Sequence, residues 1–172
     1  MSSLSMPALD DAVIARREQI IASLSAIVPG EGVVVDENEM RAFESDGLTA
    51  YKALPFIVVL PETVEQVASV LEYCHSQGIK VVPRGSGTSL SGGALPLEDA
   101  VLLVMSKFNS VLEIDYPNRC AVVQPGVTNL GITHSVEDEG FYYAPDPSSQ
   151  IACSIGGNVA ENSGGVHCLK YG

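Results

Sequence analysis

The spacing of hydrophobic residues in the first third of the chain predicts one long helix followed by short elements. From Asp11 to Val28 apolar residues recur at helical spacing, which is typical of an amphipathic helix. Asp10 or Asp11 can cap its start, and Pro29-Gly30 can end it. Between Val33 and Tyr51 the pattern indicates short strands and turns, with a helical turn near residues 37–43.

From Phe56 the pattern changes to strand, helix and strand. Ile57–Leu60 is expected to be a buried strand, and Lys80–Pro83 a second short strand. Thr63 and Gln66 form a capping box for the intervening helix, which Gly78 can end. A strand–helix–strand unit of this length predicts parallel pairing of its two strands. The helix face expected to be buried carries Val64, Val67, Ala68, Leu71 and Cys74.

The second half of the chain predicts further strands and then a stretch of small residues. A helix is expected from Thr128 to Glu139, closed by Gly140, and the segment 145–172 is expected to be ordered loop with short elements. Three strands are expected, at Val101–Met105, Val111–Asp115 and Cys120–Val123.

Composition and charge narrow the function classes. The chain has 172 residues, enough for one sizeable core. Its 9 basic and 21 acidic side chains give a net charge of −12, which argues against binding to nucleic acid or to an anionic membrane surface. No apolar run approaches the roughly 20 residues that a spanning helix needs. The expected location is therefore the cytoplasm.

The cysteines give no sign of a metal centre. None of the four belongs to a Cys-x-x-Cys pair, so buried free thiols are expected instead of a zinc or iron–sulfur site. The four are Cys74, Cys120, Cys153 and Cys168.

The first chemical signal is the glycine-rich loop from Pro83 to Gly93, directly after a predicted strand. Glycines let the backbone approach a ligand closely, and successive exposed N–H groups form a concavity for an anion such as a dinucleotide pyrophosphate. The loop lacks the lysine of a P-loop, and Leu90 stands where the dinucleotide fingerprint of a Rossmann fold needs its third glycine. The alternative interpretation is a flexible surface loop without a ligand.

The second signal is the segment from Ser154 to Gly165, in which two Gly-Gly pairs flank two asparagines. Just upstream, the two prolines of residues 144–147 are expected to form a rigid turn. Two rigid walls of small residues, far apart in the sequence, would suit a long flat ligand lying between two lobes.

Together these segments resemble the FAD-binding domain of the vanillyl-alcohol oxidase and p-cresol methylhydroxylase (PCMH) superfamily. The residues that carry the resemblance are the loop 83–93, the segment 144–149 and the segment 155–172. Within the superfamily the likeness is greatest to the flavin subunits of bacterial glycolate oxidases, relatives of the D-lactate dehydrogenases.

The resemblance implies an α+β fold, a PCMH-type FAD-binding domain. Such a domain would comprise a small βαβ subdomain and part of a second, mixed-sheet subdomain, incomplete at the C-terminus. Residues 1–52 would form an N-terminal helix and lead-in, and residues 53–172 the truncated FAD domain. A truncated sheet would leave an open edge and exposed apolar surface, so low stability or self-association is expected.

The resemblance also implies a set of cofactor-binding residues. Because superfamily members with covalent flavin often have a histidine where this chain has Thr88, non-covalent FAD is expected. For Arg84 a charge near the phosphates and a structural ion pair remain equal alternatives, and His167 is either a flavin contact or a residue without chemistry. No catalytic residue and no metal ligand is assigned. The implied FAD contacts are Pro83, Arg84, Gly85, Ser86, Gly87, Thr88, Ser89, Pro145, Gly156, Gly157, Asn162, Gly164 and Gly165.

The implied activity of the full-length enzyme is oxidation of a small 2-hydroxy acid, glycolate or D-lactate, to the 2-oxo acid by hydride transfer to flavin. The 172-residue chain alone is expected to be inactive. Implied partners are a second flavin subunit and an iron–sulfur subunit, through which the protein would associate with the inner membrane. Two alternatives stay open: a related flavin oxidase for another alcohol or D-2-hydroxy acid, and a non-catalytic truncated product.

Overall fold

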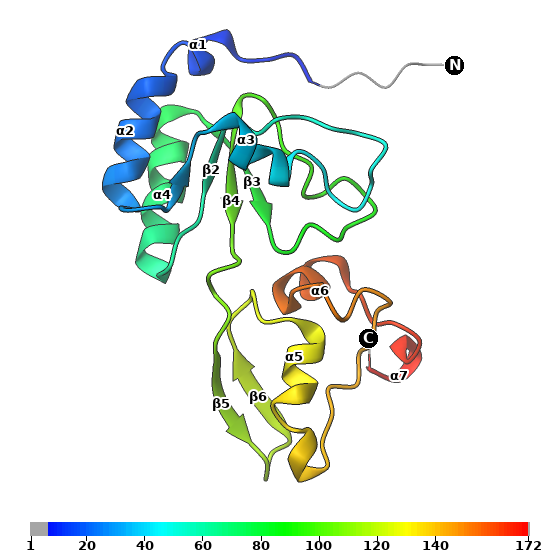
Figure 1. Cartoon of the computed structure of the whole chain (residues 1–172). Coiled ribbons are helices and arrows are strands. Elements are labelled where there is room, and N and C mark those ends of the chain that lie inside the picture. Colours follow the sequence, from blue (N-terminus) through cyan, green and yellow to red (C-terminus); the bar gives the residue numbers. More distant parts are fainter. Residues whose placement is uncertain (1–6, 172) are drawn as a thin grey trace.

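A computed structural model describes residues 7–171, which form two lobes stacked end to end (Figure 1). Residues 1–6 and Gly172, the last residue of the predicted FAD domain, lie outside the described part. The first lobe holds a four-stranded sheet with helices packed on it. The second holds a two-stranded sheet and several short helices. The α+β class expected from the sequence is confirmed.

The sheet of the first lobe has the strand order β1-β2-β4-β3. These strands are β1 (Val33–Val34), β2 (Ile57–Val59), β3 (Lys80–Arg84) and β4 (Ala100–Val104). β1 runs antiparallel to β2, whereas β2 and β3 both run parallel to β4. The strands on either side of the helix therefore share a direction, as expected. The prediction that they pair directly is wrong, because β4 is fully buried and lies between them.

Apolar side chains of the central strands β2 and β4 point alternately to the two faces of the sheet, so the core has one part on each face. Val59 and Leu103 belong to a cluster under helices α2 (Arg17–Ile27) and α4 (Val64–Gln77). Val58 and Leu102 pack on the other face with Met40 of the short helix α3 (Glu37–Met40). Because successive strand residues point to opposite faces, the uninterrupted apolar run of β4 reflects a strand that is covered on both sides.

The predicted N-terminal helix is interrupted. α1 (Asp11–Ile14) and α2 are separated at Arg16, which has φ −99° and ψ 12°. From this position the Arg16 guanidinium donates to the side-chain and main-chain oxygens of Gln77, both at 3.1 Å, at the end of α4. The break thus fastens the N-terminal helices to α4. The helices share the core of residues after 53, and the boundary at residue 52 stays a prediction.

The caps of α4 are confirmed, but its buried face is only partly as predicted: Cys74 is buried and Val67 packs against the core. Thr63 accepts from the N–H of Gln66, and Gly78 ends the helix with φ 67°. Val70 and Cys74 are the buried residues, whereas Val64 and Leu71 are 69% and 45% exposed. The cause is tertiary: α2 packs beside α4 and covers the side that carries Val70.

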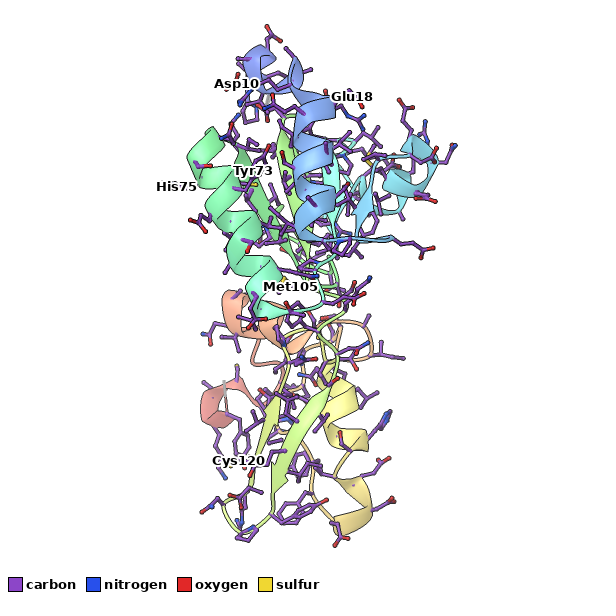
Figure 2. All side chains as sticks on the ribbon, turned by 90° about the vertical axis from the view of Figure 1, so that its left-hand side faces the viewer. Asp10, Glu18, Tyr73, His75, Met105 and Cys120 are labelled. Atoms are coloured by element: carbon purple, nitrogen blue, oxygen red, sulfur yellow. The ribbon has the colours of Figure 1, made fainter. Side chains whose placement is uncertain are left out.

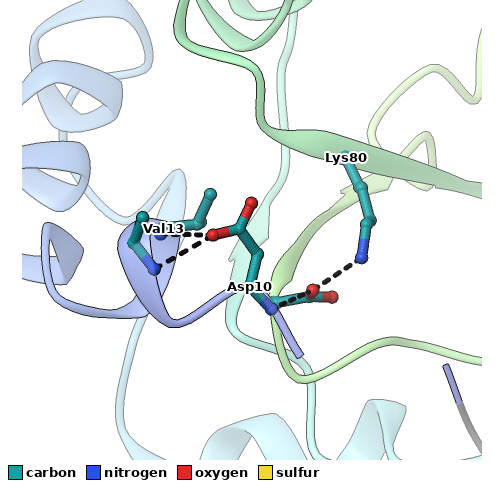
Figure 3. Close-up of polar contacts among 5 residues, drawn as sticks. Asp10, Val13 and Lys80 are labelled. Atoms are coloured by element: carbon teal, nitrogen blue, oxygen red, sulfur yellow. Dashed lines mark hydrogen bonds and ion pairs between the residues drawn. The ribbon is translucent and has the colours of Figure 1, made fainter. Parts of the chain in front are cut away.

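A buried carboxylate fastens the start of α1 to the sheet (Figure 3). Asp99, just before β4, accepts from the backbone N–H of Asp10 at 2.9 Å and from Lys80 Nζ at 2.6 Å. The Asp10 side chain accepts in turn from the N–H groups of Ala12 and Val13. Burial raises the pKa of Asp99, but the hydrogen bonds from Lys80 and Asp10 lower it by more than burial raises it, so that the pKa is lowered overall.

Replacing Asp99 with asparagine is expected to lower the free energy of unfolding at pH 7 by about 1.5–3 kcal/mol, the value of a hydrogen bond to a charged group. Because the folded-state pKa is lowered, this stabilisation is present above the unfolded carboxyl pKa and is lost as pH falls through the folded value. Urea unfolding at pH 7 and pH 3 should therefore show a difference between wild type and Asp99→Asn that shrinks at the lower pH. An equal difference at both values would contradict this role.

The second lobe is built on a hairpin of β5 (Val111–Asp115) and β6 (Cys120–Val123). The helix expected at 128–139 is shorter and broken: α5 (Asn129–His134) ends at Ser135, and the 3-10 turn η2 (Glu137–Glu139) follows, closed by Gly140 with φ 77°. Val136, with φ −132°, is the residue that leaves the helical region. Just before it, the Ser135 hydroxyl donates to the carbonyl of Gly131 at 2.6 Å, a bond that slightly destabilises the last turn. α6 (Ile155–Glu161) and α7 (Cys168–Tyr171) complete the lobe.

Cys74 and Cys153 are buried free thiols, as expected, whereas Cys120 and Cys168 are exposed. Within residues 7–171, no helix combines the length and the apolar character that crossing a membrane requires.

Candidate functional site

A cleft of about 420 Å³ lies where the two lobes meet. Met105, which is labelled at this junction in Figure 2, follows β4 and lines the cleft. One wall comes from residues 83–94 of the first lobe, and the other from residues 149–163 of the second. The structure thus brings together the two segments of small residues that the sequence singled out.

The glycine loop begins where β3 ends. β3 is an edge strand, so Pro83 can stand inside it, one residue before its end, without removing a hydrogen bond that the sheet needs. None of the backbone N–H groups of residues 85–90 donates a hydrogen bond to another described residue. Residues 85–89 of this run line the cleft, and a run of free N–H groups along a cleft wall is the arrangement that binds phosphate oxygens without a lysine.

Two polar side chains of the opposite wall are buried without partners. Ser154, which precedes α6, is 3% exposed, and Asn158 is 7% exposed. Neither Ser154 Oγ nor Asn158 Nδ2 has a hydrogen-bond partner among the described residues, although both residues line the cleft. They stand four positions apart, on one face of α6. Buried polar atoms are normally satisfied, so this pair is suited to the polar groups of a ligand.

The two walls touch at a position that requires glycine. A Cβ on Gly85 would lie 2.2 Å from Ser154 Oγ. A Cβ on Gly156 would lie 2.8 Å from the Pro125 side chain, where the Gly156 N–H donates to the Pro125 carbonyl at 2.8 Å. The cleft therefore keeps its shape only with bare backbone at residues 85 and 156.

Arg84 points into the protein behind the loop. It is 7% exposed, and its Nη1 donates to the carbonyls of Ser45 at 3.0 Å and Ala94 at 3.1 Å. Burial lowers the pKa of its guanidinium, and the charge of Asp46 acts against that shift. The sequence left two alternatives for Arg84, a charge near the phosphates and a structural ion pair. Neither describes these contacts, since the partners are backbone carbonyls.

Of the predicted contacts, residues 83–89, Gly156 and Gly157 line the cleft, whereas Pro145, Asn162, Gly164 and Gly165 do not. Asn162 ends α6 with φ 55°. Pro145 accepts from the side chain of Asn129 at 2.9 Å. Gly165 pairs with Asp146, and a Cβ there would lie 2.2 Å from the Asp146 carbonyl carbon.

His167 lies outside the cleft lining and contacts Asp146, the residue that pairs with Gly165. Its ring Nδ1 is 3.0 Å from Asp146 Oδ2, and its N–H donates to Asp146 Oδ1 at 3.4 Å. Burial raises the pKa of Asp146, but the hydrogen bonds from His167 outweigh burial, so that the pKa is lowered overall. The contact between Asp146 and His167 holds together two neighbouring segments of the second lobe. Ser149 follows Asp146, Ser163 precedes His167, and both serines line the cleft.

Sequence reasoning missed several cleft residues, among them Ser149, Cys153, Ser154 and Asn158. The signal for Ser154 and Asn158 was available, because their spacing of four places them on one helix face once Ser154-Ile-Gly-Gly-Asn is recognised as a helix start. The two glycines concealed it, since they favour a loop interpretation.

A second hollow of about 370 Å³ lies in the second lobe between the hairpin, α5 and α6. Its lining is mainly apolar and includes Val123, Ile132, Phe141 and Ile155. It lacks the glycine loop and the unpartnered polar atoms, so we place the candidate cofactor site in the cleft between the lobes.

Comparisons with known proteins identify what this site resembles. The family model described as "FAD binding domain" matches residues 55–172. The glycolate oxidase subunit GlcD of Escherichia coli (strain K12) is 56% identical over 156 residues, 91% of this chain and 31% of that protein. GlcD of Bacillus subtilis (strain 168) is 42% identical over 80% of this chain and 29% of its own length. Mitochondrial D-2-hydroxyglutarate dehydrogenase of Bos taurus is 34% identical over 90% of this chain and 28% of its length.

Solved structures show the same fold. p-Cresol methylhydroxylase with substrate bound has a TM-score of 0.72 at 22% identity, over 88% of this chain and 30% of that one. An alkyldihydroxyacetonephosphate synthase has a TM-score of 0.77 at 24% identity, over 90% and 34%. The 4-ethylphenol oxidase from Gulosibacter chungangensis has a TM-score of 0.74 at 28% identity, over 88% and 30%. The chain spans about a third of the length of the curated relatives it matches.

Proposed function

Because the chain belongs to the family of FAD binding domains and its cofactor is FAD, we propose that the cleft between its lobes is the site that holds this FAD without a covalent bond. The free N–H groups of residues 85–90 would hold the pyrophosphate, and Ser154 and Asn158 would contact polar groups of the cofactor from the other wall. These unpartnered donors are the single observation that carries the proposal. Pro145, Asn162, Gly164 and Gly165 would support the wall from behind.

The proposed reaction of the full-length protein is oxidation of a small 2-hydroxy acid to the 2-oxo acid. Bound FAD would supply the electron acceptor for this chemistry. Residues of this chain would orient the cofactor and keep water from its phosphates. The relatives support this substrate class, because one group is named for glycolate and another for D-2-hydroxyglutarate. Glycolate or D-lactate is the substrate that we propose.

The proposed partners are a second flavin subunit and an iron–sulfur subunit, which would place a cytoplasmic protein at the inner membrane. Support comes from the sequence resemblance and from the names of the two GlcD relatives, which describe them as subunits. Co-purification of the full-length protein with both partners is the expected result.

Reduction of a redox dye by the FAD-loaded full-length protein tests the substrate class. Glycolate, D-lactate, D-2-hydroxyglutarate and 4-ethylphenol should be compared at equal concentration. We expect turnover with glycolate or D-lactate, and none with the phenol. Turnover with D-2-hydroxyglutarate alone would move the assignment to the larger hydroxy acids. Turnover only with the phenol, or with none of the four, would contradict the proposal.

A further inference from the structure

The back of the glycine loop rests on a segment that precedes the residues matched by the FAD-binding family model. This lead-in, residues 43–47, provides the carbonyl of Ser45 to Arg84 Nη1 at 3.0 Å. The same nitrogen donates to the carbonyl of Ala94, on the far side of the loop, at 3.1 Å. The Arg84 guanidinium carbon lies 5.8 Å from the ring centroid of Phe43. One buried side chain therefore joins the lead-in to both ends of the loop.

Two glycines allow this packing. A Cβ on Gly87 would lie 2.3 Å from Arg84 Nη2, so the loop passes directly over the guanidinium. A Cβ on Gly47 would lie 2.7 Å from the carbonyl oxygens of Thr88 and Ser89. The carbonyls of the loop thus lie against the lead-in along the same residues whose N–H groups are free.

We propose that Arg84 is a positioning residue, which fixes the loop in the shape that presents its N–H groups to FAD and does not place its own charge on the phosphates. The guanidinium is committed to backbone carbonyls and is 7% exposed. The cofactor site then includes residues 43–47, although none of them lines the cleft. This inference rests on the proposed FAD site.

Comparing lysine with methionine at position 84 distinguishes a positioning role of Arg84 from a role of its charge. Arg84→Lys keeps the positive charge, but its Nζ ends one bond short of Nη1, the single nitrogen that donates to both carbonyls. We therefore expect Arg84→Lys and Arg84→Met to raise the Kd for FAD alike, by about tenfold, since each loses the two hydrogen bonds of Nη1. Gly47→Ala should do the same, because its Cβ pushes the lead-in off the loop and its backbone lies outside the left-handed region. Arg119→Met, at an exposed arginine in the hairpin turn of the second lobe, is the matched control and should leave the Kd unchanged.

Titration of the chain with FAD, followed by flavin fluorescence and visible circular dichroism, measures these values. The dependence of Kd on ionic strength should be the same in Arg84→Met as in wild type, because a buried brace adds no screened charge at the phosphates. Recovery of wild-type Kd by Arg84→Lys, or a wild-type Kd in a folded Gly47→Ala, would overturn the inference. Failure of the wild type to bind FAD would instead refute the proposed function. If Arg84→Met does not fold, Arg84→Lys and Gly47→Ala decide.

Discussion

Replacing Gly85 with alanine is expected to raise the Kd for FAD roughly 10- to 100-fold, because overpacking a tight contact costs about 1–3 kcal/mol. The added Cβ would lie 2.2 Å from Ser154 Oγ, and Ser154 is only 3% exposed. To relieve the overlap, the glycine loop and α6 must separate, and the N–H groups of the loop would then no longer face the same ligand atoms as Ser154 and Asn158.

A second substitution tests the cause. Ser154→Gly removes the hydroxyl that the new Cβ would meet, so Gly85→Ala with Ser154→Gly should bind FAD more tightly than Gly85→Ala alone. Gly78→Ala is the matched control. Its Cβ meets nothing within 4 Å, and its φ of 67° makes alanine costly only for folding, by about 1–2 kcal/mol. Gly78→Ala should therefore lower the melting temperature and leave the Kd unchanged. A Gly85→Ala protein with wild-type affinity would refute the described contact between the walls.

Replacing Asn158 with leucine is expected to change stability and cofactor binding in opposite directions. In the free protein Asn158 Nδ2 is buried without a partner, which costs about 1–3 kcal/mol. Leucine has a similar volume and removes that cost, so the melting temperature of the FAD-free chain should rise. The same change removes a donor from the cleft, so the Kd for FAD should rise by about tenfold.

The opposite signs are what distinguish a ligand contact from a structural residue. Asn129 provides the comparison, since it is 1% exposed and its Nδ2 donates to the carbonyl of Pro145, although its Oδ1 is also without a partner among the described residues. Leucine there would leave the Pro145 carbonyl without its donor. Asn129→Leu should lower the melting temperature. Thermal melts with and without FAD measure both effects. A lower melting temperature for FAD-free Asn158→Leu, with an unchanged Kd, would show that Asn158 serves the fold and not the cofactor.

Elements with local signals were predictable from the sequence. Thr63 and Gly78 mark the ends of α4 by cap chemistry that depends only on neighbouring residues, and the strands of the first lobe follow from their apolar runs. The glycine loop was likewise recognisable, because glycines and hydroxyl residues directly after a strand limit what the backbone can do there.

The features that the sequence did not predict depend on contacts between residues far apart in the chain. The insertion of β4 between β2 and β3 depends on which strand buries most on both faces, and the sequence order conceals it. The break at Arg16 depends on Gln77, 61 residues away. The orientation of Arg84 depends on the carbonyl of Ser45, 39 residues before it. The contact of Ser154 with the opposite wall depends on Gly85, 69 residues before it in the sequence.

Retention of flavin by the purified chain tests the central claim most directly. The chain should be incubated with FAD or with riboflavin, which has the same ring but no phosphates, then desalted and examined by visible absorbance and circular dichroism. We expect FAD to remain bound with an induced visible circular dichroism signal, ADP to displace it, and riboflavin to be lost, because the free N–H groups of residues 85–90 are proposed to hold the pyrophosphate. Equal retention of riboflavin, or retention of neither flavin, would contradict the account.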